Sequence, residues 1–326
     1  MSTSRRQLLA LGAMAAFPGL SLGQVRETYP SRPLRLVVPV PPGGPADLAA
    51  RAIAERLREE LGQPVVVDNR AGAAGTLGSS LALQAPSDGY TLLLSLPSAQ
   101  ITAPLLFAKP PFDGAKDFTA IGQFLRTTAV LLVNKSVPVS NFQGLVNHVK
   151  ARPGQLNYSS TGIGSNPHLM MELVKQTTGM HIVHIPYKGG APMLQAAIAN
   201  EVQVLFGELS TAMPWIQAGQ LKPLGIVSRK RSALLPDVPS LVEEQVIDAP
   251  ADFWMGLAGP PRMPADRVQQ LNQALAKAVE HPEMKQFFAK TATEAAFTTP
   301  ESFAALWQAE QSRWENLINT RKIRVE

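Results

Sequence analysis

Three glycine-rich stretches hold the residues of this sequence that could do chemistry. They are PPGG at 41–44 with Asp47 after it, NRAGAAGTLG at 69–78, and SSTGIGSNPH at 159–168. Each turn comes directly after an expected strand. Glycine lets a backbone approach a ligand closely, and the free N–H groups at a helix start attract anions. A single such turn is as readily an ordinary connection between strand and helix, but three together predict an anion or carboxylate site.

Patterns typical of common enzyme classes are missing from the sequence. It contains no G-x-x-x-x-G-K-[ST] phosphate loop, no G-x-G-x-x-G and no G-x-S-x-G nucleophile elbow. His181 and His184 are three apart in an expected strand, so they point to opposite faces and do not share a metal. His184 is expected to be a hydrogen-bonded core residue. Asp47 fits a helix cap that fixes the loop better than it fits a catalytic carboxylate. The pattern indicates a binding site without a reaction, a metal or a cofactor.

The elements that position these turns alternate along the chain. Near-continuous Val, Leu and Ile runs predict strands covered on both faces, at 34–40, 65–68, 90–96, 129–134, 156–160, 181–187, 202–206 and 224–228. Helices are expected at 47–61 and 168–178, each closed by a glycine, and the segment from Pro264 is expected to be mainly helical. The apolar stripe of the first helix is assigned to Leu48, Ala52, Ile53, Leu57 and Leu61.

This alternation predicts an α/β architecture with right-handed crossovers. In an open α/β sheet, ligands bind beyond the carboxyl ends of the strands. All three glycine-rich turns lie at such ends, so the elements and the turns point to the same place.

Composition and charge narrow the class of protein. The chain has 326 residues, of which 45% are hydrophobic and 17% charged, which is enough for two domains. It has no cysteine, so disulfides and thiolate metal sites are excluded. The net charge of +5 comes without a dense basic tract and interleaved aromatics, so no nucleic-acid partner is expected.

The first 23 residues have the features of an export signal peptide. Arg5 and Arg6 precede an apolar run from Leu8 to Phe17, and a cleavage site is expected near Gly23. The arginine pair fits the twin-arginine route, although a Sec signal can carry the same pair. The apolar run is shorter than the roughly 20 residues that span a bilayer. The mature chain is therefore expected to be soluble and periplasmic.

Longer motifs, found in order along the chain, resemble the Bug-type solute receptors. They are YPSRPLRLVVPVPPGGPADLAARAIAERL, GQPVVVDNRAGAAGTLG, DGYTLLL, PGQLNYSSTGIGSNPHL, VHIPYKGGAPML, LPDVPSLVE and FWMGLAGPPRMP. These TctC-like proteins are the extracytoplasmic binding components of tripartite tricarboxylate transporters. The resemblance implies a two-lobed, type II periplasmic-binding-protein-like fold with a ligand cleft between the lobes. Lobe 1 would comprise 24–126 and 252–326, and lobe 2 would comprise 127–251, with crossings near 124–130 and 250–256.

The resemblance also implies a set of ligand-binding residues that hold a small carboxylate, largely through backbone amides and ordered water. In lobe 1 these are Pro42, Gly43, Gly44, Asp47, Gly72, Ala73, Ser95 and Ser98. In lobe 2 they are Thr161, Gly162, Ser165, His168, Tyr187, Gly189, Gly190 and Glu208. Arg70 is left out because pairing with Asp68 explains it equally well.

Glu208 departs from the family pattern, which more often has Asp or a small residue there. A longer acid would either favour a ligand with an amine or hydroxyl group or face solvent. Pro41 and Pro45 depart as well. These departures concern the identity of the ligand, not the fold.

The predicted function is therefore a non-enzymatic, monomeric receptor. It would capture an organic acid or amino acid by cleft closure and deliver it to membrane transporter subunits. Two alternatives stay open: a ligand sensor that signals to a membrane partner, and a secreted hydrolase or isomerase on the same fold. Because Asn keeps one acceptor, Asp47→Asn is expected to weaken binding less than Asp47→Ala.

Overall fold

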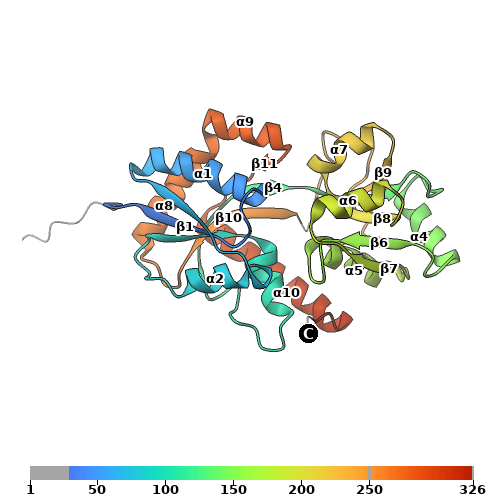
Figure 1. The fold of residues 1–326 in the computed structure, drawn as a ribbon, viewed down its shortest axis with the longest axis horizontal. Helices are drawn as coiled ribbons and strands as arrows, with labels where there is room; N and C mark the ends of the chain where they lie inside the picture. Colours follow the sequence, from blue (N-terminus) through green and yellow to red (C-terminus); the bar gives the residue numbers. More distant parts are fainter. Residues whose placement is uncertain (1–28, 249–251, 325–326) are drawn as a thin grey trace, which may run out of the picture.

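Two mixed β-sheets, with helices packed around them, organise this computed structural model, which describes residues 29–248 and 252–324. Figure 1 shows the sheets side by side, one within the blue and orange elements and the other within the green and yellow ones. The predicted α/β class is confirmed. The predicted export signal lies outside the described residues.

The first sheet has the strand order β11-β4-β10-β3-β1-β2. β1, β2 and β3 are parallel, whereas β10 runs antiparallel to both of its neighbours. The strands are β1 (Leu34–Val38), β2 (Val65–Asn69), β3 (Thr91–Ser95), β4 (Thr119–Thr127), β10 (Phe253–Gly259) and β11 (Glu294–Ala295).

The second sheet has the strand order β7-β6-β8-β5-β9. β6 is parallel to β7 and β8, and β5 is antiparallel to β8 and β9. The strands are β5 (Ala129–Asn134), β6 (Asn157–Ser160), β7 (Val183–Pro186), β8 (Val204–Glu208) and β9 (Leu221–Val227).

The two helices predicted in detail are present, and each ends as its glycine indicated. Gly62 and Gly179 adopt left-handed φ values of 66° and 71° directly after α1 and α5. The helices are α1 (Pro45–Leu61), α2 (Thr76–Leu83), α3 (Ala103–Leu105), α4 (Phe142–Ala151), α5 (Asn166–Thr178), α6 (Gly190–Ile198), α7 (Leu209–Gln217), α8 (Ala265–Glu280), α9 (Pro282–Thr291) and α10 (Pro300–Arg321), with short turns η1 (Ala73–Gly75) and η2 (Pro97–Thr102).

The buried face of α1 differs from the prediction at the first turn. Ala49, Ile53 and Leu57 are buried, whereas Leu48 is 51% exposed. Each residue turns a helix by about 100°, so Leu48 lies on the side opposite Leu57. The predicted stripe was wrong there because small alanines, not Leu48, fill the contact between helix and sheet.

The chain passes between the sheets at one end of both. β4 ends at Thr127 and β5 begins at Ala129. The return passage leads into β10, whose first residue pairs with Thr127, and residues 249–251 of the predicted second crossing lie outside the described residues. α10 begins beside β4 and ends against α5 of the second sheet. Which segments move together as lobes stays a prediction.

Candidate ligand-binding site

The first sheet brings three predicted segments to one edge. The parallel register pairs Val38 with Asn69 and Val37 with Leu93, so the residues that follow β1, β2 and β3 leave the sheet on the same side. They also touch: a Cβ added at Gly75 would lie 2.4 Å from Ala99 Cβ, and one added at Gly78 would lie 2.9 Å from Pro39 Cα. The turns at 41–44 and 72–73 and the segment at 95–98 are therefore neighbours.

The second sheet gathers the remaining predicted residues in the same way. Ser160 pairs with Pro186, and Tyr158 pairs with Val204, in parallel registers. The carboxyl ends of β7, β6 and β8 therefore lie at one edge. This edge carries the predicted residues at 161–168, 187–190 and 208.

The two edges adjoin each other at the passage from β4 to β5. Antiparallel pairing places the end of β4 at the carboxyl edge of β3, through β10. Ala129, the first residue of β5, pairs with Glu208 at the carboxyl end of β8. The Thr102 hydroxyl donates to the Gly164 carbonyl oxygen at 3.3 Å, which joins the two sets of turns directly.

Asp47 fixes the first glycine turn. Its carboxylate accepts hydrogen bonds from Gly43 N at 2.9 Å, Arg51 Nε at 3.0 Å and Asn69 Nδ2 at 2.9 Å. The hydrogen bond from Arg51, helped by those from Gly43 and Asn69, lowers the pKa of Asp47 to about 2 against the opposing effect of burial. The predicted loop-fixing role of Asp47 is confirmed, and its side chain is only 3% exposed.

The free donors of this turn belong to the start of α1. Gly43 uses its N–H on Asp47, but Gly44, Ala46 and Asp47 donate theirs to no acceptor within 29–248 and 252–324. A Cβ added at Gly43 or Gly44 would meet no atom within 4 Å. The helix start therefore presents open backbone N–H groups and the positive end of its dipole, which suit an anion.

The contacts of Asp47 change the expected outcome of its substitution. One carboxylate oxygen of Asp47 accepts from Gly43 and Arg51, and the other accepts from Asn69. In Asp47→Asn, an NH2 group would replace one of these oxygens and would face donors instead of accepting from them. We therefore expect Asn to weaken carboxylate binding nearly as much as Ala, by about 1–2 kcal/mol, the scale of a lost cap. Isothermal titration calorimetry of both variants measures this. Near wild-type affinity in Asp47→Ala would show that loop order does not matter for binding.

The other predicted ligand-binding residues of lobe 1 differ in how exposed they are. Gly72, with φ 142°, and Ala73, with φ 46°, form an exposed turn. Ser98 is half-buried at the start of η2. Ser95 is completely buried and hydrogen-bonds to the side chain of Gln100. Ser95 therefore supports the loop after β3 from the protein interior and has no exposed surface for a ligand.

The lobe 2 turn is held from below by side chains. The Gly162 carbonyl oxygen accepts from Ser165 Oγ at 2.7 Å and from Ser160 Oγ at 3.1 Å. Gly164 N donates to His168 Nδ1 at 2.9 Å. His168 is 6% exposed, so it shapes the turn, while Thr161, Gly162 and Ser165 remain half-exposed above it.

A stack of three rings continues below this turn. His168 stacks on His184 with ring centroids 4.2 Å apart, and His184 stacks on Tyr158 at 4.8 Å. His184 Nε2 lies 2.6 Å from Ser160 Oγ, as expected for a hydrogen-bonded strand histidine. No group of three or more His, Asp or Glu residues in the described part of the chain could hold a metal.

Acid should weaken the fold through His168. Burial, with the charge of His184, lowers the pKa of His168 from 6.5 to about 4. Between these values the unfolded chain binds the extra proton, so the free energy of unfolding falls as pH drops from about 6.5 to about 4, by about 3 kcal/mol. Urea unfolding at pH 7 and pH 4.5 measures this loss. His168→Asn keeps an acceptor for Gly164 N but does not titrate, so its loss should be smaller; an equal loss would contradict the assignment.

The remaining predicted residues lie at the ends of β7 and β8. Tyr187 is half-buried and donates its N–H to the Ser160 carbonyl oxygen at 2.9 Å. Gly189, with φ 107°, and Gly190 are exposed at the start of α6. Glu208 is half-buried at the junction of β8 and α7, and burial raises the pKa of its carboxyl group.

Two lobe 1 residues that the sequence did not single out contact the lobe 2 turn. Thr102 donates to Gly164, and a Cβ on Gly164 would lie 2.1 Å from Leu106 Cδ1. The only sequence signal was Gly164 itself, in the run Gly-Ile-Gly, because its close approach to a neighbour requires glycine there.

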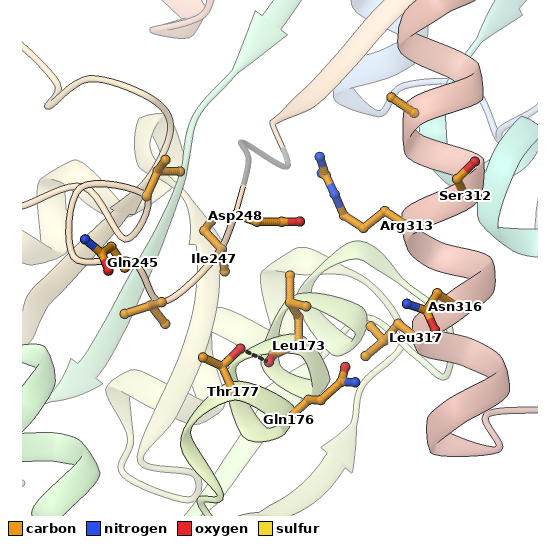
Figure 2. Close-up of a pocket in the computed structure, with 13 residues that line it drawn as sticks. Leu173, Gln176, Thr177, Gln245, Ile247, Asp248, Ser312, Arg313, Asn316 and Leu317 are labelled. Atoms are coloured by element: carbon orange, nitrogen blue, oxygen red, sulfur yellow. Dashed lines mark hydrogen bonds between the residues drawn. The ribbon is translucent and has the colours of Figure 1, made fainter.

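A cavity of about 840 Å³ lies elsewhere, between α5, residues 242–248 and α10. Figure 2 shows Asp248 and Arg313 reaching into it, and Arg313 pairs with Glu310 at 3.0 Å. None of the predicted site residues lines this cavity, and α5 contributes residues 173–177 from its C-terminal half. No α-helix begins among the lining residues, so this cavity offers no helix N-terminus to an anion.

This chain is similar to known proteins in both sequence and fold. The family described as "Tripartite tricarboxylate transporter family receptor" matches residues 49–323. BugT of Bordetella pertussis is 32% identical over 314 residues, which cover 96% of each chain. Within the described residues, no helix is long and apolar enough to cross a membrane.

Two solved structures extend this likeness. The R. palustris protein Rpa4515, solved with adipate, has a TM-score of 0.77 and 33% identity, covering 91% of this chain and 99% of that one. MatC from Rhodopseudomonas palustris, solved with bound malate, has a TM-score of 0.74 and 28% identity, covering 89% and 100%. The predicted resemblance and the periplasmic-binding-protein-like fold are confirmed. This chain belongs to the tripartite tricarboxylate transporter receptor family.

Proposed function

We propose that this protein is a periplasmic receptor that binds a small carboxylate between the two sheet edges. The observation that carries the proposal is the open start of α1, where Gly44, Ala46 and Asp47 donate their N–H groups to no acceptor in the described part of the chain, beside a turn that Asp47 holds in shape. The two solved relatives bind adipate and malate, which are both carboxylates. The ligand would be held by the first edge, and contacts from the second edge would favour closure.

The proposed role is capture and delivery without a reaction. The carboxylate of Asp47 is saturated by three donors, so it is not poised to abstract a proton. His184 pairs with the Ser160 hydroxyl, but Ser160 is completely buried and offers no surface to a substrate. The bound carboxylate would pass to the membrane subunits of a transporter, and the receptor would act as a monomer.

The binding energy needed is modest. A micromolar dissociation constant corresponds to roughly −8 kcal/mol. Hydrogen bonds to a charged group contribute about 1.5–3 kcal/mol each, so a few backbone donors supply much of this total.

Thermal unfolding with paired ligands tests the proposal. Adipate and malate are compared with their diamides, which have nearly the same shape without the charges. We expect one or both carboxylates to raise the melting temperature and the diamides to leave it unchanged, because only a ligand that binds the native state stabilises it. Proton NMR of the recovered ligand should show it intact. Equal stabilisation by the diamides, or conversion of the acid, would contradict the proposal.

A further inference from the structure

Glu208 occupies the end of β8 on the face covered by α5. Side chains alternate along a strand, so Glu208 points to the same face as Val204 and Phe206. Those two residues pack in one core cluster with Leu169 and Met170 of α5. The register that pairs Tyr158 with Val204 places Glu208 level with Gly162 when it is continued along both strands. The side chain therefore lies at the carboxyl end of β8, on the side of the sheet that α5 covers.

The Glu208 carboxyl group is engaged by no protein partner within the described residues. It stands at the N-cap position of α7 but caps no N–H group, and only its backbone carbonyl oxygen accepts, from Thr211 Oγ1 at 3.0 Å. Two other acids have their partners within the protein: Asp47 has three donors, and Glu172 of α5 accepts from Tyr158 and Arg321. Burial raises the pKa of Glu208, as expected for an acid without a compensating charge.

An acid in this position has a direct consequence for the ligand. If a carboxylate sits at the start of α1, the rest of the ligand extends toward the second sheet edge, where it meets Glu208. A second ligand carboxylate could bind there only if Glu208 took up a proton, whereas a hydroxyl or ammonium group would donate to the free acceptor directly. Such discrimination by an unpaired polar group is stronger than discrimination by shape alone.

We propose that Glu208 selects ligands that bring a hydrogen-bond donor to the second sheet edge. The ligand class is then hydroxycarboxylates and aminocarboxylates rather than plain carboxylates. This inference rests on the proposed function.

Calorimetry with two sets of four-carbon acids tests the selection. The sets are succinate, malate and aspartate, and butyrate, 3-hydroxybutyrate and 3-aminobutyrate. In each set the carbon skeleton is constant and only the donor changes. Wild-type protein should bind the best donor-bearing acid at least about tenfold more tightly than its parent acid, the scale of one hydrogen bond to a charged group. In Glu208→Gln the affinities for the donor-bearing acid and its parent acid should differ by no more than about threefold.

Glu280→Gln is the matched control. The Glu280 side chain is 72% exposed at the end of α8, where Lys277 pairs with Glu60 near the C-terminal end of α1, so the same chemical change should leave the ratio of affinities unaltered. An unchanged ratio in Glu208→Gln, or a wild-type preference for succinate and butyrate, would overturn the inference while carboxylate binding stands. Failure of the wild-type protein to bind any of these acids, or adipate, would overturn the proposed function and the inference with it.

Discussion

A Gly43→Val variant is expected to lose carboxylate binding while it keeps its fold. Gly43 is exposed and has φ 87°, and a Cβ there would meet no atom of the described residues within 4 Å beyond its chain neighbours. A valine side chain would therefore enter the open space above the start of α1 that we assign to the ligand. Positive φ strains a β-branched residue by about 1–3 kcal/mol, so some stability is lost too. We expect affinity to fall at least about a hundredfold in calorimetry, the scale of losing two charge-assisted hydrogen bonds.

Two further variants separate the ligand effect from strain. Gly219 has φ 65° and the same open surroundings, but it follows α7 at the end remote from Glu208. Gly219→Val should lose comparable stability and keep full binding. Gly44 has φ −83°, which valine tolerates, so Gly44→Val should lose binding with little loss of stability. Unchanged affinity in both Gly43→Val and Gly44→Val would remove this turn from the site.

Glu172→Gln is expected to lower the free energy of unfolding by about 3 kcal/mol, because breaking a buried ion pair leaves the partner charges uncompensated. The Glu172 side chain is 8% exposed and accepts from Tyr158 Oη at 2.9 Å and Arg321 Nη2 at 2.7 Å. Its ion pair with Lys175, whose side chain is 13% exposed, completes the cluster. Glutamine keeps one acceptor but removes the charge. Urea unfolding monitored by circular dichroism measures the difference.

An exposed ion pair provides the control for this prediction. Glu243 pairs with Arg231 at 2.7 Å, and both side chains are nearly half exposed. Exposed pairs contribute at most about 1 kcal/mol, so Glu243→Gln should be nearly neutral. A loss in Glu172→Gln no larger than that in Glu243→Gln would mean that the cluster beneath the lobe 2 turn adds nothing to stability.

The sequence located the strand-end turns because their signals are local. A glycine in αL conformation ends α1 and another ends α5, and both positions can be recognised without tertiary contacts. β4 and β10 were not predicted, and each contains a glycine that depends on distant packing. A Cβ at Gly122 would lie 2.7 Å from Asn272 Nδ2, and one at Gly256 would lie 2.3 Å from Phe303 Cζ. Side chains of α8 and α10 leave no room for a larger residue at these two positions. Glycine has a low strand propensity, which weakens the strand signal in the sequence.

The candidate site likewise contains some features that local sequence signals predict and others that depend on distant contacts. The role of Asp47 follows from its position at a helix start, which the sequence displays. The burial of Ser95 and His168 does not, because it depends on Gln100 beneath one loop and on the ring of His184 beneath the other. Long-range pairing of this kind leaves no periodic trace in the chain.

A crystal structure with the acid that raises the melting temperature most tests the central claim most directly. We predict that one ligand carboxylate accepts hydrogen bonds from the N–H groups at the start of α1, near Gly44, and that the far end of the ligand faces Glu208. Ligand density in the cavity between α5 and α10, with the strand-end turns empty, would contradict this account.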